Sequence, residues 1–247
     1  MSRERPILFN GDMVRAILTG AKTQTRRAIK LPHHNPLGQW EACTSGGHGA
    51  RDRKGNLVPE EVCIWHTRTG DTLVCPFGQL GDRLWVRERF KPVASGQIKS
   101  GYGEIRYGYA YEADSSTRWD KRTTIIHDLT GQPGKGPMQF QQSPWKSAIC
   151  MPHRACRMVL EITAVRVERL QAMPEADWEA EGISFCMEDP STAAGHAFNE
   201  AEHYAIAGVS MRGTPEDHGM RAQFAEQGLD WDSNPWVWVI EFKAVTP

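Results

Sequence analysis

The chain has 247 residues, a formal net charge of −1 and a hydrophobic content of 40%. This length and composition are typical of a globular protein that buries a substantial core. No apolar run reaches about 18 residues, which argues against a membrane-spanning helix. The first residues, MSRERPILFNGD, lack the apolar segment of a secretory leader, so we expect a cytoplasmic protein with no membrane partner.

The charges are distributed unevenly along the chain. Residues 1–31 carry seven Lys/Arg against two Asp/Glu, whereas residues 175–232 carry two against thirteen. The remainder carries 20 against 15, so a basic body is interrupted by one acidic segment. This pattern indicates an anionic ligand on the body. The acidic segment either docks a protein partner or is a solvated helical arm.

Six cysteines are scattered through the chain, and without a secretory leader we expect them to be reduced thiols. Five residues could supply zinc ligands: Cys43, His48, Cys63, His66 and Cys75. They contain no CxxC pair, and the alternative is that these thiols and imidazoles lie in loops and at strand edges. The sequence predicts no cofactor and no assigned metal site.

The first elements are a short strand and a short helix. Residues 6–9 (PILF) predict the strand, and Asn10 is suited to cap the helix that follows. Apolar side chains recur four residues apart between residues 11 and 19, which indicates one amphipathic helix. Gly20 is placed to end that helix in the left-handed conformation.

Two loop-rich insertions follow. Residues 32–80 contain a predicted hairpin, in which VCIWHT and TLVC flank the turn RTGD. Gly81–Asp82 predicts a tight turn before the strand RLWVRERF. Residues 92–147 read as a second loop-rich insertion, although IRYGYAYE has the aromatic alternation of a strand.

The last third of the chain contains the clearest strand, CRMVLEITAVRVERL, then helical stretches over residues 174–204, and it closes with the β-forming run NPWVWVIEFKAV. We therefore expect a mainly β chain with helices (α+β), organised as one domain over residues 1–247 with insertions at 32–80, 92–147 and 175–232. Strands near both ends of the chain favour a closed or nearly closed small β-barrel in which the first and last strands are neighbours.

A cluster of cations and hydroxyls follows the first helix directly. It places three cations and two hydroxyls within six residues, which suits contact with a phosphate or a nucleotide. The residues of this cluster that we select are Lys22, Thr23, Thr25, Arg26 and Arg27. The alternative is a solvated turn whose cations interact with the end of the helix.

Two glutamates lie in β-rich runs, where glutamate is depleted. They are Glu88 in LWVRERF and Glu161 in MVLEITAV. A carboxylate in such a run is either paired with a cation or has a raised pKa that suits proton transfer. The alternative to catalysis is an ion pair with Arg87, Arg157 or Arg166.

Further cations and a tryptophan could form a basic, aromatic groove. The segment MPHRACR contributes Arg154 and Arg157, and the strand RLWVRERF contributes Arg83, Trp85 and Arg87. This mixture binds single-stranded nucleic acid, because rings stack on bases while cations neutralise phosphates.

Taken together, these motifs resemble the ASCH domain, a family with a PUA-like barrel fold. The resemblance rests on RPILFNGDMVRAILTGAKTQTRR, GDRLWVRE, MPHRACR and NPWVWVIEF, and within it on KTQTRR above all. It covers residues 5–31, 81–91, 145–170 and 234–243, and it points to a subgroup frequent in phages and prophages. The resemblance therefore implies a protein of a bacterial host cell that binds RNA or a nucleotide.

Relatives in this family include amidohydrolases that remove the acetyl group from N4-acetylcytidine. By their pattern Lys22 would be the base, Thr25 the nucleophile and Glu161 the acid that relays the proton. Burial or the neighbouring Arg26 and Arg27 would have to lower the pKa of Lys22 from its ordinary value of about 10.4. Lys22 and Thr25 have opposite parity, so a turn or bulge is needed to bring them together.

Our leading hypothesis is an RNA- or nucleotide-binding protein, and hydrolysis of an acylated or modified cytidine through Lys22, Thr25 and Glu161 is the second hypothesis. In the binding reading, the phosphates are held by Lys22, Arg26, Arg27, Arg83, Arg87 and Arg154. One alternative is a ribonuclease in which His153 or Glu88 takes part. Another is a non-catalytic phage accessory protein that captures a protein partner through residues 175–232.

Overall fold

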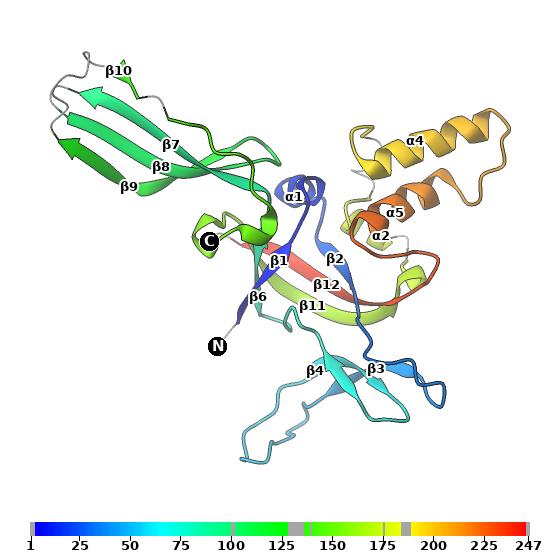
Figure 1. Cartoon of the computed structure of the whole chain (residues 1–247). Coiled ribbons are helices and arrows are strands. Elements are labelled where there is room, and N and C mark those ends of the chain that lie inside the picture. The colour runs from blue at the N-terminus through cyan, green and yellow to red at the C-terminus, as the bar shows by residue number, and fades with distance from the viewer. Residues whose placement is uncertain are drawn as a thin grey trace. The chain divides into compact units, whose positions relative to one another are not determined.

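The computed structural model describes residues 3–99, 102–127, 136–138, 140–174, 176–183 and 189–245. The chain divides into two compact units. Unit 1 comprises residues 1–5, 16–84 and 160–245, and unit 2 comprises residues 6–15, 85–159 and 246–247. Figure 1 shows the strands and helices of both units. Each unit is built from separated stretches of chain, and the single domain with three insertions stays a prediction.

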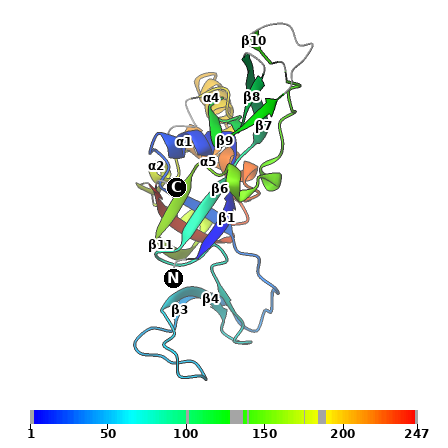
Figure 2. The same cartoon turned by 90° about the vertical axis from the view of Figure 1, so that its left-hand side faces the viewer.

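A five-stranded sheet contains most of the strands that the sequence predicts. Its strand order is β1 (Glu4–Leu8), β6 (Arg83–Arg87), β11 (Val159–Arg169), β12 (Trp236–Val245) and β2 (Gln24–Ala28). Figure 2 shows β1, β6 and β11 along one side of it. The chain is mainly β with few helices, as expected for the α+β class.

The expected closure of this sheet is wrong for the described residues. The first strand, β1, pairs with β6 at one edge, whereas the last strand, β12, lies between β11 and β2. Four consecutive residues of β12, 237–240, are buried. A strand that is apolar on both faces is stabilised by pairing on both sides, which explains its inner position. The sheet is therefore open, with β1 and β2 at its edges.

The predicted helix is confirmed as α1 (Gly11–Leu18). The side-chain oxygen of Asn10 accepts a hydrogen bond from the backbone N–H of Met13 at 2.9 Å, which is the predicted cap. Gly20 ends the helix with a φ of 79°, a conformation that favours glycine. The backbone N–H of Lys22 then donates to the carbonyl of Ala16 at 3.0 Å, so the chain turns back beside its own helix before β2.

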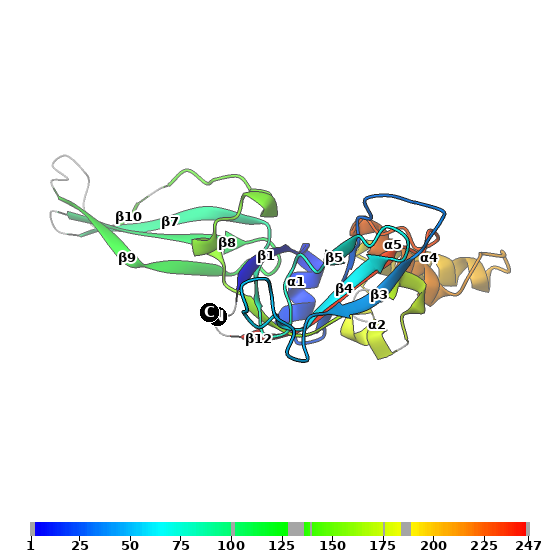
Figure 3. The same cartoon turned by 90° about the horizontal axis from the view of Figure 1, so that it is seen from below.

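The insertion over residues 32–80 forms a three-stranded antiparallel sheet, which Figure 3 shows. Its strands are β3 (Trp40–Ser45), β4 (Glu61–His66) and β5 (Thr72–Val74). The pair β4–β5 is the predicted hairpin, with Ile64 opposite Leu73. The strand β3 has no counterpart among the predicted elements.

Cysteines of this sheet lead to a prediction about thiol reactivity. Burial, together with the neighbouring Cys43, raises the pKa of Cys63 to about 12, and burial raises the pKa of Cys75 to about 11. Both thiols are therefore protonated and unreactive at neutral pH. We expect iodoacetamide to alkylate the exposed Cys150 before the buried Cys63 and Cys75 in the folded protein, as measured by peptide mass spectrometry. Equal labelling of Cys63 and Cys150 before unfolding would contradict this expectation.

Unit 2 contains a second antiparallel sheet in the order β10 (Gly136–Pro137), β7 (Phe90–Lys99), β8 (Tyr102–Tyr111) and β9 (Thr117–His127). The prediction that residues 92–147 are loop-rich is therefore wrong for most of this segment. Only β8 had a recognisable alternation, and it pairs along its length with both neighbours. A bulge interrupts the pairing near Gly108, where a Cβ would lie 2.4 Å from the carbonyl oxygen of Arg118. Only glycine fits at that position.

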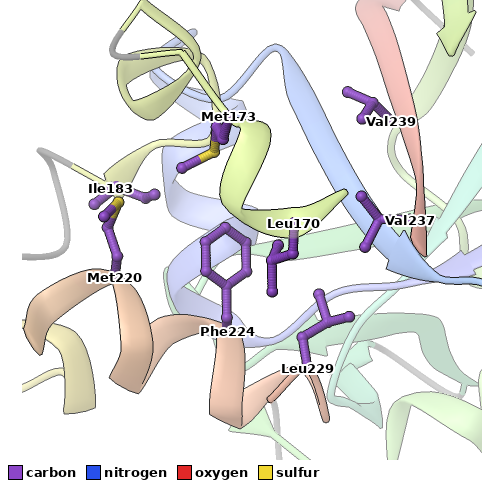
Figure 4. Close-up of a cluster of buried hydrophobic side chains, with 8 residues drawn as sticks. All are labelled: Leu170, Met173, Ile183, Met220, Phe224, Leu229, Val237 and Val239. Atoms are coloured by element: carbon purple, nitrogen blue, oxygen red, sulfur yellow. The ribbon is translucent and has the colours of Figure 1, made fainter. Parts of the chain in front are cut away.

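The acidic segment folds into helices, and one of them belongs to the core of unit 1. The helices are α2 (Ala176–Ala180), α4 (Ala193–Ile206) and α5 (Pro215–Glu226). Figure 4 shows the cluster that α5 completes, which contains Leu170, Met173, Ile183, Met220, Phe224, Leu229, Val237 and Val239. Helix α4 packs against α5. The interpretation as a solvated arm is therefore wrong for α5.

Candidate functional site

The turn between α1 and β2 places Lys22 in a fully buried ion pair. Its ammonium group donates to Glu181 Oε2 at 2.7 Å and to the backbone carbonyl of Glu181 at 2.8 Å. Both side chains are 0% exposed. Arg26 approaches the other oxygen of the same carboxylate, with Nη1 3.1 Å from Oε1. One carboxylate thus receives two cations of the KTQTRR motif.

The backbone around Glu181 is fitted closely to Lys22. The two residues form an isolated antiparallel bridge, and the N–H of Thr23 donates to the carbonyl of Ala180 at 2.9 Å. Gly182 follows with a φ of 75°, and a Cβ there would lie 3.3 Å from the Cβ of Lys22. A glycine after Glu181 therefore permits both the turn and the close approach of the two chain segments.

Further carboxylates surround Arg26. Its Nη2 lies 2.6 Å from Asp177 Oδ2 and 3.1 Å from Glu168 Oε2. Arg166 on β11 bonds to Asp177, to Glu168 and also to Glu241. We call this set the buried ion cluster after Lys22, Arg26 and Glu181, whose side chains are 0% exposed. Its other members, with side chains that are 16–40% exposed, are Arg166, Glu168, Asp177 and Glu241.

The cluster contains three cations and four carboxylates. Burial raises the pKa of Asp177, but hydrogen bonds from Arg26 and Gln24 and the charge of Arg166 outweigh it, so the net pKa is lowered. The neighbouring Arg27 has a pKa lowered to about 10 by burial, against the opposing charge of Glu181. Arg27 is therefore still charged at neutral pH.

Thr25 is buried on the other face of β2. It lies opposite Ile240 of β12, whereas its neighbours Gln24 and Arg26 point to the face that holds the buried ion cluster. The Thr25 side chain is 0% exposed, and within the described part of the chain its hydroxyl has no hydrogen-bond partner. A buried hydroxyl without a partner is unusual, because its desolvation is not compensated.

Glu161 lies apart from these contacts. Its Oε1 is 3.0 Å from Lys243 Nζ, and the two side chains are 31% and 60% exposed. The structure therefore gives Glu161 a surface ion pair with Lys243, a cation that is not among the three predicted partners. The carboxylate that meets Lys22 is Glu181 instead.

Glu88 forms one of the predicted ion pairs. Both of its oxygens lie 2.8 Å from the guanidinium of Arg157, which also contacts Asp114 at 2.7 Å and stacks 4.1 Å from the centre of the Tyr111 ring. Burial raises the pKa of Glu88, and Arg157 opposes this shift. We predicted that a glutamate in a β-rich run has either a cation partner or a raised pKa. Glu88 has both.

The residues predicted to form a basic groove are divided between the units. The exposed Arg83 belongs to unit 1, whereas Trp85, Arg87 and Arg154 belong to unit 2. In unit 2 the guanidinium of Arg87 lies 5.3 Å from the centre of the Trp85 ring, which meets His153 edge-on at 5.1 Å. The exposed Arg154 completes this basic and aromatic surface. The groove itself stays a prediction.

Several residues of the buried ion cluster were not selected from the sequence. Glu181 and Asp177 lie in EADWEAEG, which reads as part of a solvated acidic arm, and Gln223 on α5 donates to the carbonyl of Glu181 at 3.4 Å. Gly182, which follows Glu181 at the end of a short helix, could have indicated this contact. A glycine at such a position often marks a place where two backbones approach closely.

The described residues contain no group of three or more His, Cys, Asp or Glu side chains placed to hold a metal ion. Cys43 and Cys63 lie opposite each other on β3 and β4, but no three of the five candidate zinc ligands are brought together. No helix within those residues is long and apolar enough to cross a membrane.

No family model, curated protein or solved structure matches the chain. The resemblance to the ASCH domain therefore rests on the sequence motifs alone.

Proposed function

We propose that the chain is an ASCH-type amidohydrolase that binds RNA or a nucleoside and removes an acyl group from a modified cytidine. The observation that supports this proposal is the fully buried Lys22–Glu181 pair, three residues before the buried hydroxyl of Thr25. The proposal keeps Lys22 and Thr25 in the roles that the resemblance implies. It assigns the proton-relaying carboxylate to Glu181 rather than to Glu161.

The energetics of the pair favour a chemical role. Removing two charges from water costs several kcal/mol per ion, and replacing a buried pair by apolar residues is often neutral or stabilising. The free energy of unfolding alone therefore does not explain why a buried ion pair is present. Strongly coupled acids and bases in a protected environment are characteristic of proton-transfer sites, although structural ion networks share this feature.

The reaction would proceed through an acyl-threonine. The Glu181 carboxylate takes a proton from the Lys22 ammonium, and the resulting amine takes the hydroxyl proton of Thr25 as its oxygen attacks the amide carbonyl carbon. The carbon–nitrogen bond then breaks, and the released amino group of cytidine receives a proton from Lys22. Water hydrolyses the threonine ester to a carboxylic acid. In the structure Lys22 Nζ lies with Glu181 and Arg26 on the opposite face of β2 from Thr25, so these steps require the chain over residues 22–25 to rearrange when substrate binds.

A pair of glutamine variants tests the assignment of the carboxylate. We expect Glu181→Gln to lower turnover of N4-acetylcytidine by about 100-fold or more, because the variant has no base to deprotonate Lys22. Glu161→Gln removes an equal charge from the surface pair and is expected to stay within about twofold of wild type. Product would be measured by mass spectrometry. If Glu161→Gln is inactive and Glu181→Gln is active, the proton-relaying carboxylate is Glu161 and not Glu181.

A second candidate function is RNA binding without catalysis, and the charge of unit 2 favours it. Unit 2 carries 13 Lys/Arg and 7 Asp/Glu. Lys146 and Arg154 line a cavity of about 270 Å³ there together with Phe90 and Tyr109. Cations beside aromatic rings suit single-stranded RNA. The ribonuclease and the capture of a protein partner by residues 175–232 stay predictions.

A further inference from the structure

A cavity of about 500 Å³ in unit 1 lies away from the buried ion cluster. Its walls come from the chain just after β2, the loop before β3, the end of β11 and the segment that enters β12. The lining residues that matter for the argument are Ile29, His34, Trp40, Arg169 and Trp236. A cavity of this size can accommodate a small ligand or one unit of a polymer.

Two tryptophans line the cavity. The guanidinium of Arg169 lies 4.3 Å from the centre of the Trp236 ring, which fixes a cation against an aromatic face. Trp40 is 8% exposed, meets the ring of His66 at 5.1 Å, and its indole N–H donates to a backbone carbonyl at 3.3 Å. The ring of His33 also lies 5.2 Å from that of Trp40, so Trp40 is packed from inside the protein, whereas the partly exposed Trp236 is suited to stack on a planar heterocycle.

The charge of the cavity differs from that of the unit that contains it. Unit 1 carries 16 Lys/Arg and 23 Asp/Glu, yet none of the residues that line the cavity is acidic. Arg169 and the exposed His34 supply positive or titratable groups there. This local composition favours an anionic ligand, and a nucleotide combines a negative charge with a planar heterocycle.

The cavity also lies on the sheet face that carries Thr25. Thr25 and Arg27 share one face of β2, and Ile29 continues the alternation, since its N–H donates to the carbonyl of Trp236 at 2.9 Å. Four residues separate Thr25 from Ile29, which is about 13 Å along an extended strand. A ligand in the cavity would therefore lie on the Thr25 face at a fixed distance from that hydroxyl.

We propose that this cavity binds one nucleotide of a single-stranded RNA, with its base against Trp236 and its phosphate at Arg169. The ligand would be an RNA strand that carries the modified cytidine elsewhere, so the natural substrate class is RNA rather than a free nucleoside. The link to Thr25 rests on the proposed function, whereas nucleotide binding by the cavity does not.

Binding measured without turnover tests this proposal. Fluorescence anisotropy of a labelled single-stranded oligoribonucleotide would be recorded with the full chain. We expect Arg169→Gln to weaken binding by about tenfold or more and to reduce its dependence on salt. Arg53→Gln is the matched control, because Arg53 is exposed in the same unit and does not line the cavity. We expect this control to bind as wild type.

Photo-cross-linking supplies a second readout that does not depend on a variant. An RNA that contains 4-thiouridine is expected to cross-link to the peptides that hold Trp40 or Trp236. Equal affinity of Arg169→Gln and Arg53→Gln, or cross-links only outside these peptides, would overturn the proposal. If cytidine 5′-monophosphate displaces the labelled RNA as well as the unlabelled oligomer does, the ligand of the cavity is a free nucleotide rather than RNA. Failure of wild type to hydrolyse N4-acetylcytidine, both as the free nucleoside and within a single-stranded RNA, would remove the proposed function and leave these binding results unchanged.

Discussion

Replacing Lys22 with methionine is expected to lower the free energy of unfolding by about 3–5 kcal/mol. The substitution keeps most of the side-chain volume but leaves the carboxylate of Glu181 buried without the ammonium that lies 2.7 Å from it. Removing one partner of a buried ion pair costs this much, because an uncompensated charge stays in a medium of low polarity. Urea denaturation gives the change as a shift of the transition midpoint.

Lys243→Met is the matched control for this prediction. It removes the same charge from the pair with Glu161, whose side chains are 60% and 31% exposed. Exposed pairs contribute about 0–1 kcal/mol, so this variant is expected to unfold close to wild type. In Lys22→Met/Glu181→Gln, part of the lost stability should return, because the buried carboxylate is gone while an oxygen is still available to Arg26. A Lys22→Met protein as stable as Lys243→Met would contradict the description of the buried ion cluster.

Replacing Thr25 with valine is expected to raise the free energy of unfolding by about 1 kcal/mol while it abolishes turnover. Valine has the shape of threonine, and the hydroxyl that it removes is fully buried without a partner among the described residues. Exchanging an unsatisfied polar group for a methyl group of the same shape is neutral or stabilising. A group that costs stability and is needed for turnover is one retained for function.

The Thr25→Ser variant tests the effect of the hydroxyl on turnover independently of the shape of the side chain. Serine keeps the nucleophile and loses a buried methyl group, so this variant is expected to be less stable than wild type by about 1 kcal/mol and to retain turnover. Thermal unfolding and product formation would be measured on the same preparations. If valine and serine variants are equally active, the Thr25 hydroxyl is not the nucleophile.

Local patterns in the sequence were sufficient for much of the fold. The helix capped by Asn10 and ended by Gly20 depends on neighbours a few residues away, and so does the hairpin of β4 and β5. The strands β11 and β12 were evident from long β-forming runs. The order of the strands was not predictable in this way, because pairing is decided between segments far apart in the sequence.

The candidate site was likewise predictable where it depends on a short motif and not where it depends on distant residues. Lys22, Thr25 and Arg26 were found from a short motif, and each is buried in unit 1. Their partner Glu181 is 159 residues from Lys22, in a segment whose many acidic residues suggested exposure to solvent. Sequence composition does not distinguish a carboxylate on a surface from one that neutralises buried cations. The sequence also did not reveal that α5 packs against the core and buries Met220 and Phe224 there.

The measurement that tests the central claim most directly is turnover of N4-acetylcytidine, followed by mass spectrometry for wild type and Thr25→Val side by side. The proposed function predicts cytidine from wild type and none from the valine variant, with both proteins folded. Equal product from both proteins would contradict it, and so would the absence of product from wild type with this compound, with other acylated cytidines and with a single-stranded RNA that contains N4-acetylcytidine.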